Sequence, residues 1–301
     1  MSSQTTSTVF MVKPVCFGFN PQTAENNAFQ KEGFNNGAQE KALGEFNEFV
    51  KLLKSKGINV VEAEDTLEPK TPDSVFPNNW FSTHENGELV LYPMFAPNRR
   101  AERKEVFINE IKKNFNFKKI VDLTIWENEN KFLEGTGSMV LDRVAKVAYA
   151  CKSPRTDENV LKDFCQKLGY TYVLFNSVDR NGKMIYHTNV IMCIGTTFAI
   201  LCSDSIKDKD ELKKVLKSLE KAGKKVVEIS FDQMEHYAGN MLELKNKEGK
   251  RFLIMSQTAL DCLTKEQKEY LEGECTILHP KIDCIEVNGG GSARCMMAEI
   301  F

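Results

Sequence analysis

Two short strands around a polar turn form a pattern that recurs along this chain of 301 residues. Four such hairpins are predicted, each rich in β-branched or aromatic residues, and they cover residues 75–92, 138–150, 189–202 and 240–255. A fifth could join residues 294–301 to residues 9–15, since these two ends hold the remaining unpaired strand-like segments. That pairing of the N- and C-terminal strands would close the chain into a ring.

The spacing of the hairpins is nearly constant. If their first positions are taken as Asn79, Gly137, Asn189, Asn240 and Arg294, these are 58, 52, 51 and 54 residues apart. Self-similarity at a fixed period indicates one repeated architecture rather than two domains. We therefore expect residues 1–301 to form a single domain, although the length alone would allow two.

Amphipathic helical patterns lie between the hairpins. Apolar side chains recur there at three- and four-residue spacing, which is one face of a helix, in residues 37–56, 100–114, 156–168, 209–222 and 264–271. A further strand follows several of these helices, at residues 59–63, 118–123, 172–175 and 225–229. The sequence thus predicts an α/β propeller with five-fold pseudosymmetry, in which each unit is a β-hairpin plus a helix and a further strand. Such a ring would bring the first positions of all five hairpins together at one end of its central axis.

The composition argues against several classes of protein. With a formal net charge of −2 and well-mixed charges, the chain has no basic patch for nucleic acid. The longest apolar stretches are strand-length, far below the ~20 residues of a membrane span, and no secretory signal is visible. The nine cysteines form no CxxC pair, so we expect no disulfide framework, no zinc site and a cytoplasmic location. The sequence does not indicate an oligomeric state.

One cysteine has a context that indicates chemistry. Cys295 ends the segment N-G-G-G-S-A-R-C, and glycines there let the backbone approach a ligand and leave N–H groups free to face an anion. A nucleophilic cysteine also needs a proton carrier. Of the four histidines, His187 opens an apolar strand at the same repeat position as Cys295. The plain alternative is that both are buried core residues.

Two further motifs stand at the first positions of hairpins. Glu134 lies in F-L-E-G-T-G-S, where it could be a solvated turn acid or could orient and stabilise a protonated histidine. Residues 72–80 hold Asp73, Asn78 and Asn79 in otherwise apolar surroundings. Two adjacent asparagines on their own would indicate only a turn.

Together these motifs resemble the pentein, or guanidine-modifying, superfamily, which includes arginine deiminases, amidinotransferases and dimethylarginine dimethylaminohydrolases. The resemblance covers nearly the whole chain and implies the five-unit α/β propeller. It rests on E-G-x-x at Glu134, H-x-N at His187 and G-G-G-x-x-R-C at Cys295, in the family's order. It implies Cys295 as the nucleophile, His187 as the general acid/base and Glu134 as its acidic partner, with no cofactor and no metal.

The same resemblance implies residues for the amino-acid end of a small-molecule substrate. P-D-S-V-F-P-N-N from residue 72, followed by A-P-N-R-R from residue 96, is similar to the dimethylaminohydrolase version. There the aspartate holds the α-amine and the first arginine the α-carboxylate, roles that fall on Asp73 and Arg99. S-P-R-T from residue 153 resembles the family's S-x-R-T and points to Arg155 as a further carboxylate ligand. A planar, permanently charged fork suits that task.

Departures from the family pattern concern the other end of the substrate. Arginine deiminases carry aspartates where this chain has Asn79 and Asn189, and those carboxylates clamp a guanidinium. Two buried carboxylates need a cation to offset their desolvation, whereas two amides suit a neutral group and can donate hydrogen bonds to a carbonyl oxygen. The ureido group of citrulline is neutral and has that oxygen. Gly137 is another departure, because many members have the second acid of E-G-G-D there.

We therefore expect a hydrolase that converts citrulline to ornithine, ammonia and carbon dioxide through a covalent intermediate on Cys295. Its expected substrate-binding residues are Asp73, Asn78, Asn79, Arg99, Arg155 and Asn189. A guanidine substrate is the alternative within enzymes, as for an arginine deiminase, a methylarginine hydrolase or an amidinotransferase. From another class, the chain could be a non-catalytic amino-acid-binding member of the fold.

Overall fold

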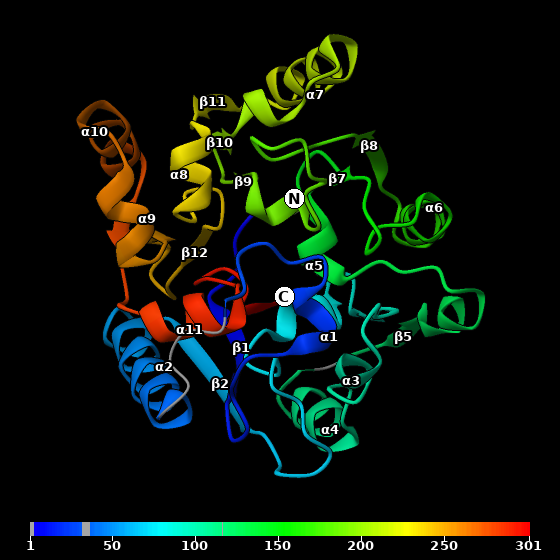
Figure 1. The fold of residues 1–301 in the computed structure, drawn as a ribbon. Coiled ribbons are helices and arrows are strands. Elements are labelled where there is room, and N and C mark those ends of the chain that lie inside the picture. The colour runs from blue at the N-terminus through cyan, green and yellow to red at the C-terminus, as the bar shows by residue number, and fades with distance from the viewer. Residues whose placement is uncertain (1–2, 32–36, 116) are drawn as a thin grey trace.

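A computed structural model of the protein describes residues 3–31, 37–115 and 117–301. Within these ranges the strands form five three-stranded sheets, which are arranged around a central axis (Figure 1). The five-unit α/β architecture predicted from the repeat is confirmed.

Each sheet is built in the same way, from an antiparallel pair and a third strand that runs parallel to the middle one. In spatial order the sheets are β15 (Ala298–Ile300), β1 (Thr8–Lys13) and β2 (Asn59–Glu64); β3 (Phe81–Thr83), β4 (Glu88–Leu91) and β5 (Lys119–Asp122); β6 (Met139–Asp142), β7 (Val147–Cys151) and β8 (Thr171–Phe175); β9 (Met192–Ile194), β10 (Phe198–Leu201) and β11 (Lys225–Glu228); and β12 (Leu242–Lys245), β13 (Arg251–Ile254) and β14 (Thr276–Leu278). The first sheet pairs the two ends of the chain, with Val9 opposite Glu299. That the whole chain is one domain stays a prediction.

Five longer helices lie on the outside of the ring (Figure 1): α2 (Ala38–Ser55), α4 (Glu105–Asn114), α6 (Glu158–Leu168), α7 (Lys209–Lys221) and α10 (Lys265–Glu274). Polar caps fix where several of them begin. The Asp208 side chain, for example, accepts hydrogen bonds from two backbone N–H groups in the first turn of α7. The shorter helices are α1 (Pro21–Ala24), α3 (Pro97–Arg100), α5 (Gly135–Ser138), α8 (Phe231–Glu235), α9 (Gln257–Cys262) and α11 (Asp283–Gly289), and the 3-10 turns are η1 (Pro77–Asn79), η2 (Thr124–Glu129), η3 (Thr188–Val190) and η4 (Ser203–Ser205).

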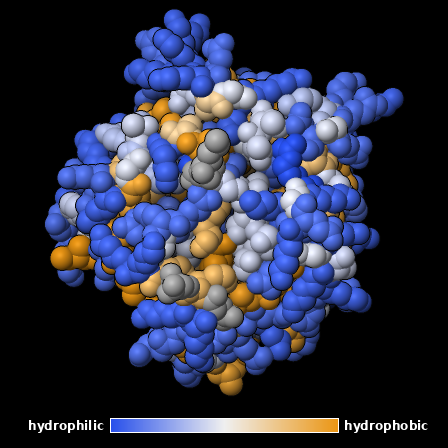
Figure 2. All heavy atoms as spheres, turned by 180° about the vertical axis from the view of Figure 1, so that it is seen from behind, coloured by the Kyte–Doolittle hydropathy of each residue, from blue (hydrophilic) through white to orange (hydrophobic). Residues whose placement is uncertain are grey.

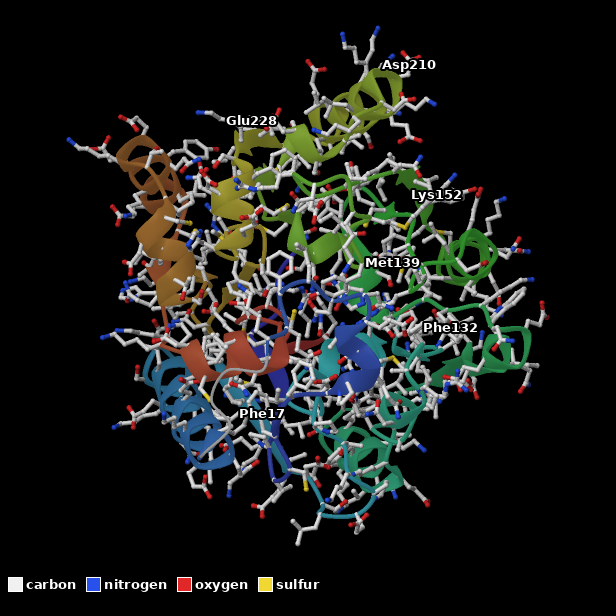
Figure 3. The ribbon with its side chains drawn as sticks, in the orientation of Figure 1. Phe17, Phe132, Met139, Lys152, Asp210 and Glu228 are labelled. Atoms are coloured by element: carbon white, nitrogen blue, oxygen red, sulfur yellow. The ribbon has the colours of Figure 1, made fainter. Side chains whose placement is uncertain are left out.

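The core lies between the outer helices and the sheets. Phe46, Phe49 and Leu53 on one face of α2 are fully buried in a cluster that includes Val60 of β2. Burying each such side chain contributes about 1.5–3 kcal/mol. Figure 3 shows the same division, because Met139 lies near the axis whereas Asp210 projects from α7 at the periphery.

The structure corrects the expected beginnings of several elements. Residues 75–80 and 189–191 were expected to be strand, but they contain the turns η1 and η3, and the strands begin only at Phe81 and Met192. A helical turn can aim neighbouring polar side chains at the axis, whereas a pleated strand points every second one away. The helix expected over residues 100–114 likewise begins only at Glu105, as α4, and Arg100 is the last residue of the separate short helix α3.

Within the described ranges, no helix is both long and apolar enough to cross a membrane. Figure 2 shows the face opposite that of Figure 1, on which hydrophilic residues predominate around a smaller number of hydrophobic ones.

Candidate active site

The expected site residues stand on turns that immediately precede the first strands of different sheets. Asn79 is the last residue of η1, Glu134 is the N-cap of α5, and His187 is the N-cap of η3. Cys295 lies in the turn between α11 and β15. The ring therefore brings together residues that are up to 216 positions apart in the sequence.

A small cavity of about 20 Å³ marks where these turns meet. Six of the nine expected site residues line it: Asp73, Asn79, Arg99, Arg155, His187 and Cys295. Glu134 and Asn189 contact the residues that line it, as described below. Asn78 is buried beside Thr136 of α5, to whose hydroxyl its side-chain amide donates at 3.4 Å, and it does not line the cavity. A substrate contact from Asn78 stays a prediction.

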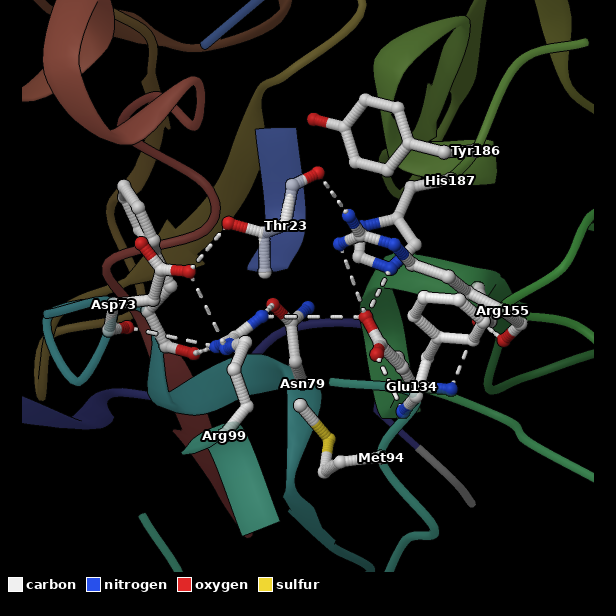
Figure 4. Close-up of polar contacts among 12 residues, drawn as sticks. Thr23, Asp73, Asn79, Met94, Arg99, Glu134, Arg155, Tyr186 and His187 are labelled. Atoms are coloured by element: carbon white, nitrogen blue, oxygen red, sulfur yellow. Dashed lines mark hydrogen bonds and ion pairs between the residues drawn. The ribbon is translucent and has the colours of Figure 1, made fainter. Parts of the chain in front are cut away.

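His187 and Glu134 form a buried pair, with 2.8 Å between the imidazole Nε2 and the carboxylate Oε2 (Figure 4). Burial lowers the pKa of His187 to about 4, although Glu134 opposes this change. Burial alone would raise the pKa of Glu134, but Arg155, His187 and Arg99 lower it to well below its usual range. At neutral pH the site therefore holds a neutral imidazole next to an ionised carboxylate.

Because burial lowers the pKa of His187, we expect the free energy of unfolding to depend on pH. Since the pKa of His187 is lower in the folded than in the unfolded protein, the unfolded state binds the proton first as the pH falls. Stability should be lost between pH 6.5 and about pH 4, with a contribution from His187 of about 3 kcal/mol. The measurement is the free energy of unfolding in denaturant at several pH values across that window.

The substitution His187→Asn should flatten this pH dependence. His236 is exposed, so His236→Asn is the matched control and should leave the slope as in the parent. Equal slopes in the parent and in His187→Asn would contradict the assignment of a neutral, buried His187.

Asn79 is held in one orientation by Arg99. The Arg99 Nη1 group donates to Oδ1 of Asn79 at 2.7 Å, while Nε and Nη2 bind the two oxygens of Glu102 at 2.8 and 2.9 Å. Because a guanidinium has no acceptor, it can face only the oxygen of the amide. The Asn79 Nδ2 group is buried and has no hydrogen-bond partner among the described residues.

Cys295 accepts hydrogen bonds from two side-chain amides. Asn240 Nδ2 lies 3.2 Å and Asn189 Nδ2 3.4 Å from the sulfur, and all three residues are buried. The Oδ1 atom of Asn189 has no partner within the part of the chain that the structure describes.

Asp73 lies at the other side of the cavity. Its Oδ2 accepts from Asn20 Nδ2 at 2.7 Å and from Thr23 Oγ1 at 3.0 Å, whereas Oδ1 is buried and unpartnered within the described residues. Burial raises the pKa of this carboxyl group, against lowering contributions from Arg99, Asn20 and Thr23. A ligand ammonium beside Oδ1 would stabilise the ionised form.

Arg155 presents its fork to oxygen atoms of the N-terminal segment. Nε donates to Asn26 Oδ1 at 2.8 Å, Nη2 donates to the same oxygen and to the backbone oxygen of Thr23 at 3.0 Å, and Nη1 donates to Glu134 at 3.4 Å. The guanidinium also stacks over the Tyr186 ring, 4.8 Å from its centroid (Figure 4). A single amide oxygen thus occupies the place where this fork could bind a carboxylate.

The segment that holds Asn26 also closes the cavity. Gln30 Nε2 donates to the backbone oxygen of Asn288 at 2.9 Å, and the backbone N–H of Lys31 donates to Val287 at 2.8 Å. A cavity of about 20 Å³ has room for about one water molecule, not for an amino acid. Thr23 and Asn27 of this segment line the cavity, which has to widen before it can hold an amino acid.

Gly137 allows the close approach of Asn79 and His187. A Cβ atom at this position would lie 2.4 Å from Asn79 Nδ2 and 2.8 Å from the His187 ring. The position that carries an acid in many members of the superfamily is therefore sterically closed here.

Sequence reasoning missed five residues of the site: Asn20, Thr23, Glu102, Tyr186 and Asn240. One of them had a visible signal, because Asn240 occupies the same repeat position as Asn189 and Asn79. Asn20, Thr23 and Tyr186 act through contacts between distant segments, and Glu102 binds Arg99 three residues away; none of these four stands in a recurring pattern. Within the described ranges, no group of three or more His, Cys, Asp or Glu residues could hold a metal ion.

Comparison with known proteins shows the family. Residues 13–301 match the family model described as N,N dimethylarginine dimethylhydrolase, eukaryotic. The chain belongs to this family, and with it to the pentein superfamily of guanidine-modifying enzymes. The family consists of hydrolases that act on arginine-like substrates. No curated protein sequence matches the chain.

Solved structures share its fold. One is the N-terminal domain of ArgZ, an arginine dihydrolase from the ornithine–ammonia cycle in cyanobacteria, which was solved covalently bound to a reaction intermediate. It has 16 % sequence identity to this chain and a TM-score of 0.74, and the comparison covers 98 % of this chain and 97 % of that chain. A variant of AgrE with L-arginine has 17 % identity and a TM-score of 0.74, and covers 98 % of this chain but 40 % of its own. A dimethylarginine dimethylaminohydrolase adduct has 14 % identity and a TM-score of 0.67 over both entire chains.

Proposed function

We propose that this protein hydrolyses citrulline to ornithine, ammonia and carbon dioxide. The observation that carries the proposal is the orientation of the Asn79 amide. Since Arg99 holds the amide with its oxygen toward the guanidinium, the group of Asn79 that is left without a partner among the described residues is its NH2 donor. A guanidinium has only donors and would face a donor, whereas the ureido oxygen of citrulline is an acceptor.

Asn189 also favours a ureido substrate, but through its amide oxygen instead of its N–H groups. Its Nδ2 group faces the sulfur of Cys295, so the unpartnered Oδ1 is left to accept from an N–H of the ligand. A ureido group offers one acceptor and several donors, which matches one buried, unpartnered amide N–H group and one buried, unpartnered amide oxygen. Neither amide carries a charge that would offset a buried guanidinium.

The chemistry proposed for these residues has two halves. The sulfur of Cys295 attacks the ureido carbon, and its proton passes to the neutral His187. Asn79 stabilises the oxyanion, His187 gives the proton to the departing ornithine nitrogen, and the carbon–nitrogen bond breaks to leave a carbamoyl thioester. His187 then takes a proton from a water that attacks this thioester, the carbon–sulfur bond breaks, and His187 returns the proton to the sulfur of Cys295. The carbamic acid released breaks down to ammonia and carbon dioxide.

Glu134 has two parts in this scheme. It binds Nε2 of His187, so Nδ1 is the nitrogen left to exchange protons with the substrate. Its negative charge also stabilises the imidazolium that forms transiently in each half of the reaction.

The amino-acid end would be held by Asp73 and Arg155. The free Oδ1 of Asp73 can accept from an α-ammonium, and the Arg155 fork can bind an α-carboxylate after Asn26 withdraws. Arg99 lines the same cavity, but its fork binds both oxygens of Glu102. We therefore assign the α-carboxylate first to Arg155, and a contact from Arg99 stays a prediction.

A guanidine substrate is the second candidate, because the family model is that of a dimethylarginine hydrolase and ArgZ of the same fold is an arginine dihydrolase. The test is a product assay with citrulline, arginine, agmatine and methylarginines at equal concentration. Ornithine from citrulline, at a kcat/KM above that of every guanidine, is the expected result. Citrulline as a product of arginine or methylarginine would replace the proposal with the second candidate.

The carboxylate assignment makes a separate prediction. Arg155→Lys should raise the KM for citrulline about 30-fold, since a point charge cannot replace two charge-assisted hydrogen bonds worth about 2 kcal/mol. The KM for the decarboxylated analogue, carbamoylputrescine, should hardly change. Steady-state kinetics with both substrates measure this, and the exposed Arg180→Lys is the matched control. If agmatine or carbamoylputrescine already equals citrulline in the parent, no carboxylate clamp exists.

A further inference from the structure

The sulfur of Cys295 lies between two carboxamides whose N–H groups point at it. Asn240 Nδ2 is 3.2 Å and Asn189 Nδ2 is 3.4 Å from Sγ. Within the described residues, no lysine or arginine donates a hydrogen bond to this sulfur. A thiolate formed here would therefore be stabilised by neutral donors.

The orientation of Asn240 is fixed by the backbone. The N–H group of Arg294 donates to Asn240 Oδ1 at 3.1 Å, so the amide nitrogen must face the opposite way. Its two hydrogens then have two acceptors, the Asn189 backbone oxygen at 3.2 Å and the sulfur of Cys295. Arg294 precedes Cys295 directly, so the residue next to the nucleophile also sets the direction of its donor.

From these contacts we propose that Asn240 is a further catalytic residue, which stabilises the Cys295 thiolate by donating a hydrogen bond to its sulfur. Asn189 donates in the same way. The proposal rests on Cys295 as the nucleophile of the proposed function. Asn240 would act in both halves of the reaction. The sulfur of Cys295 carries negative charge when the thiol loses its proton to His187, and again when the thioester is cleaved.

Other charged or titratable groups also surround the sulfur. The cavity contains Asp73, Arg99, Arg155, Tyr186 and His187, and Tyr237 lies within electrostatic reach of Cys295. Substitutions at Asn240 leave all of these in place. A change in the alkylation of Cys295 that follows Asn240→Ala therefore reports the missing donor, because that substitution adds no charge.

Asn240 could instead serve only to join two turns, through Arg294 and the backbone of Asn189. Two substitutions separate this structural role from the catalytic one. Asn240→Asp keeps the size and the acceptor for the Arg294 N–H, but places an oxygen instead of a donor beside the sulfur. Asn240→Ala removes the donor without adding charge. Asn240→Ala isolates the loss of the donor, whereas Asn240→Asp keeps the bond to Arg294 but adds a negative charge to the loss.

The experiment follows the rate at which iodoacetamide alkylates Cys295 as a function of pH, in the unliganded full-length protein, with the modified peptide identified by mass spectrometry. The midpoint should rise by at least one pH unit in Asn240→Asp and by a smaller amount in Asn240→Ala, and kcat should fall at least tenfold in both. The matched control is Asn246→Ala, a buried asparagine in the β12–β13 turn that bonds Lys56 and its own turn. Its midpoint and kcat should equal those of the parent.

An unchanged alkylation midpoint in a folded Asn240 variant would overturn the proposal, whatever happens to kcat. Because alkylation needs no substrate, this result is distinguishable from failure of the proposed function. A shifted midpoint together with no turnover of citrulline would support the role of Asn240 and reject the substrate.

Discussion

Replacing Cys295 by serine should reduce the turnover of citrulline by a factor on the order of 10⁴ or more, with little change in the melting temperature. A hydroxyl is nearly as large as a thiol but a far weaker nucleophile, and losing the nucleophile removes the covalent route entirely. The donors Asn189 and Asn240 can bond to a serine oxygen as well as to sulfur. Steady-state kinetics and thermal unfolding of the same preparation measure the two effects.

A second buried cysteine provides the control. Cys284 lies in α11 and contacts the backbone of Ala38, away from the cavity. Cys284→Ser should cost stability but retain kcat. In the parent, rapid quenching during turnover should reveal one carbamoyl group on Cys295 by mass spectrometry. Turnover by Cys295→Ser at the parent rate would remove the nucleophile assignment and favour a non-catalytic binding protein.

The double substitution Asn79→Asp/Asn189→Asp should reverse the preference between citrulline and arginine. In Asn79→Asp, one carboxylate oxygen can keep the bond to Arg99, and the other takes the place of the unpartnered N–H group. A ureido oxygen would then face a carboxylate, while a guanidinium would gain the counter-charge that the parent lacks. Leaving a buried charge without its partner costs about 3 kcal/mol, so the affinity ratio should shift on the order of 100-fold.

Binding rather than turnover is the appropriate readout for this prediction. Asn189→Asp places a carboxylate beside the sulfur of Cys295, which should slow the chemistry for either substrate. Calorimetric dissociation constants for both amino acids should therefore be measured in a Cys295→Ser background. Asn246→Asp, in the β12–β13 turn, is the matched control. If the ratio is unchanged, or if the parent already prefers arginine, the argument from substrate charge fails.

Much of the architecture could be predicted from the sequence because the repeat is strong. The positions of α2, α6, α7 and α10, and of the third strands β2, β5, β8 and β11, follow from local periodicity, which needs no knowledge of the tertiary fold. Strand β14 was not predicted. The first strand of each hairpin was harder. Apolar residues around Asn79 and Asn189 suit a strand, but the polar groups there face the axis and adopt helical turns instead.

The sequence by itself determined that one cysteine, one histidine and one glutamate stand at equivalent positions of a five-fold repeat, since spacing along the chain is enough to show this. Only the tertiary structure decided how the amides of the site are oriented. An asparagine offers both a donor and an acceptor, and which of them faces a ligand depends on neighbours from distant segments. The Arg99 guanidinium fixes the orientation of the Asn79 amide, and the backbone N–H of Arg294 fixes that of the Asn240 amide.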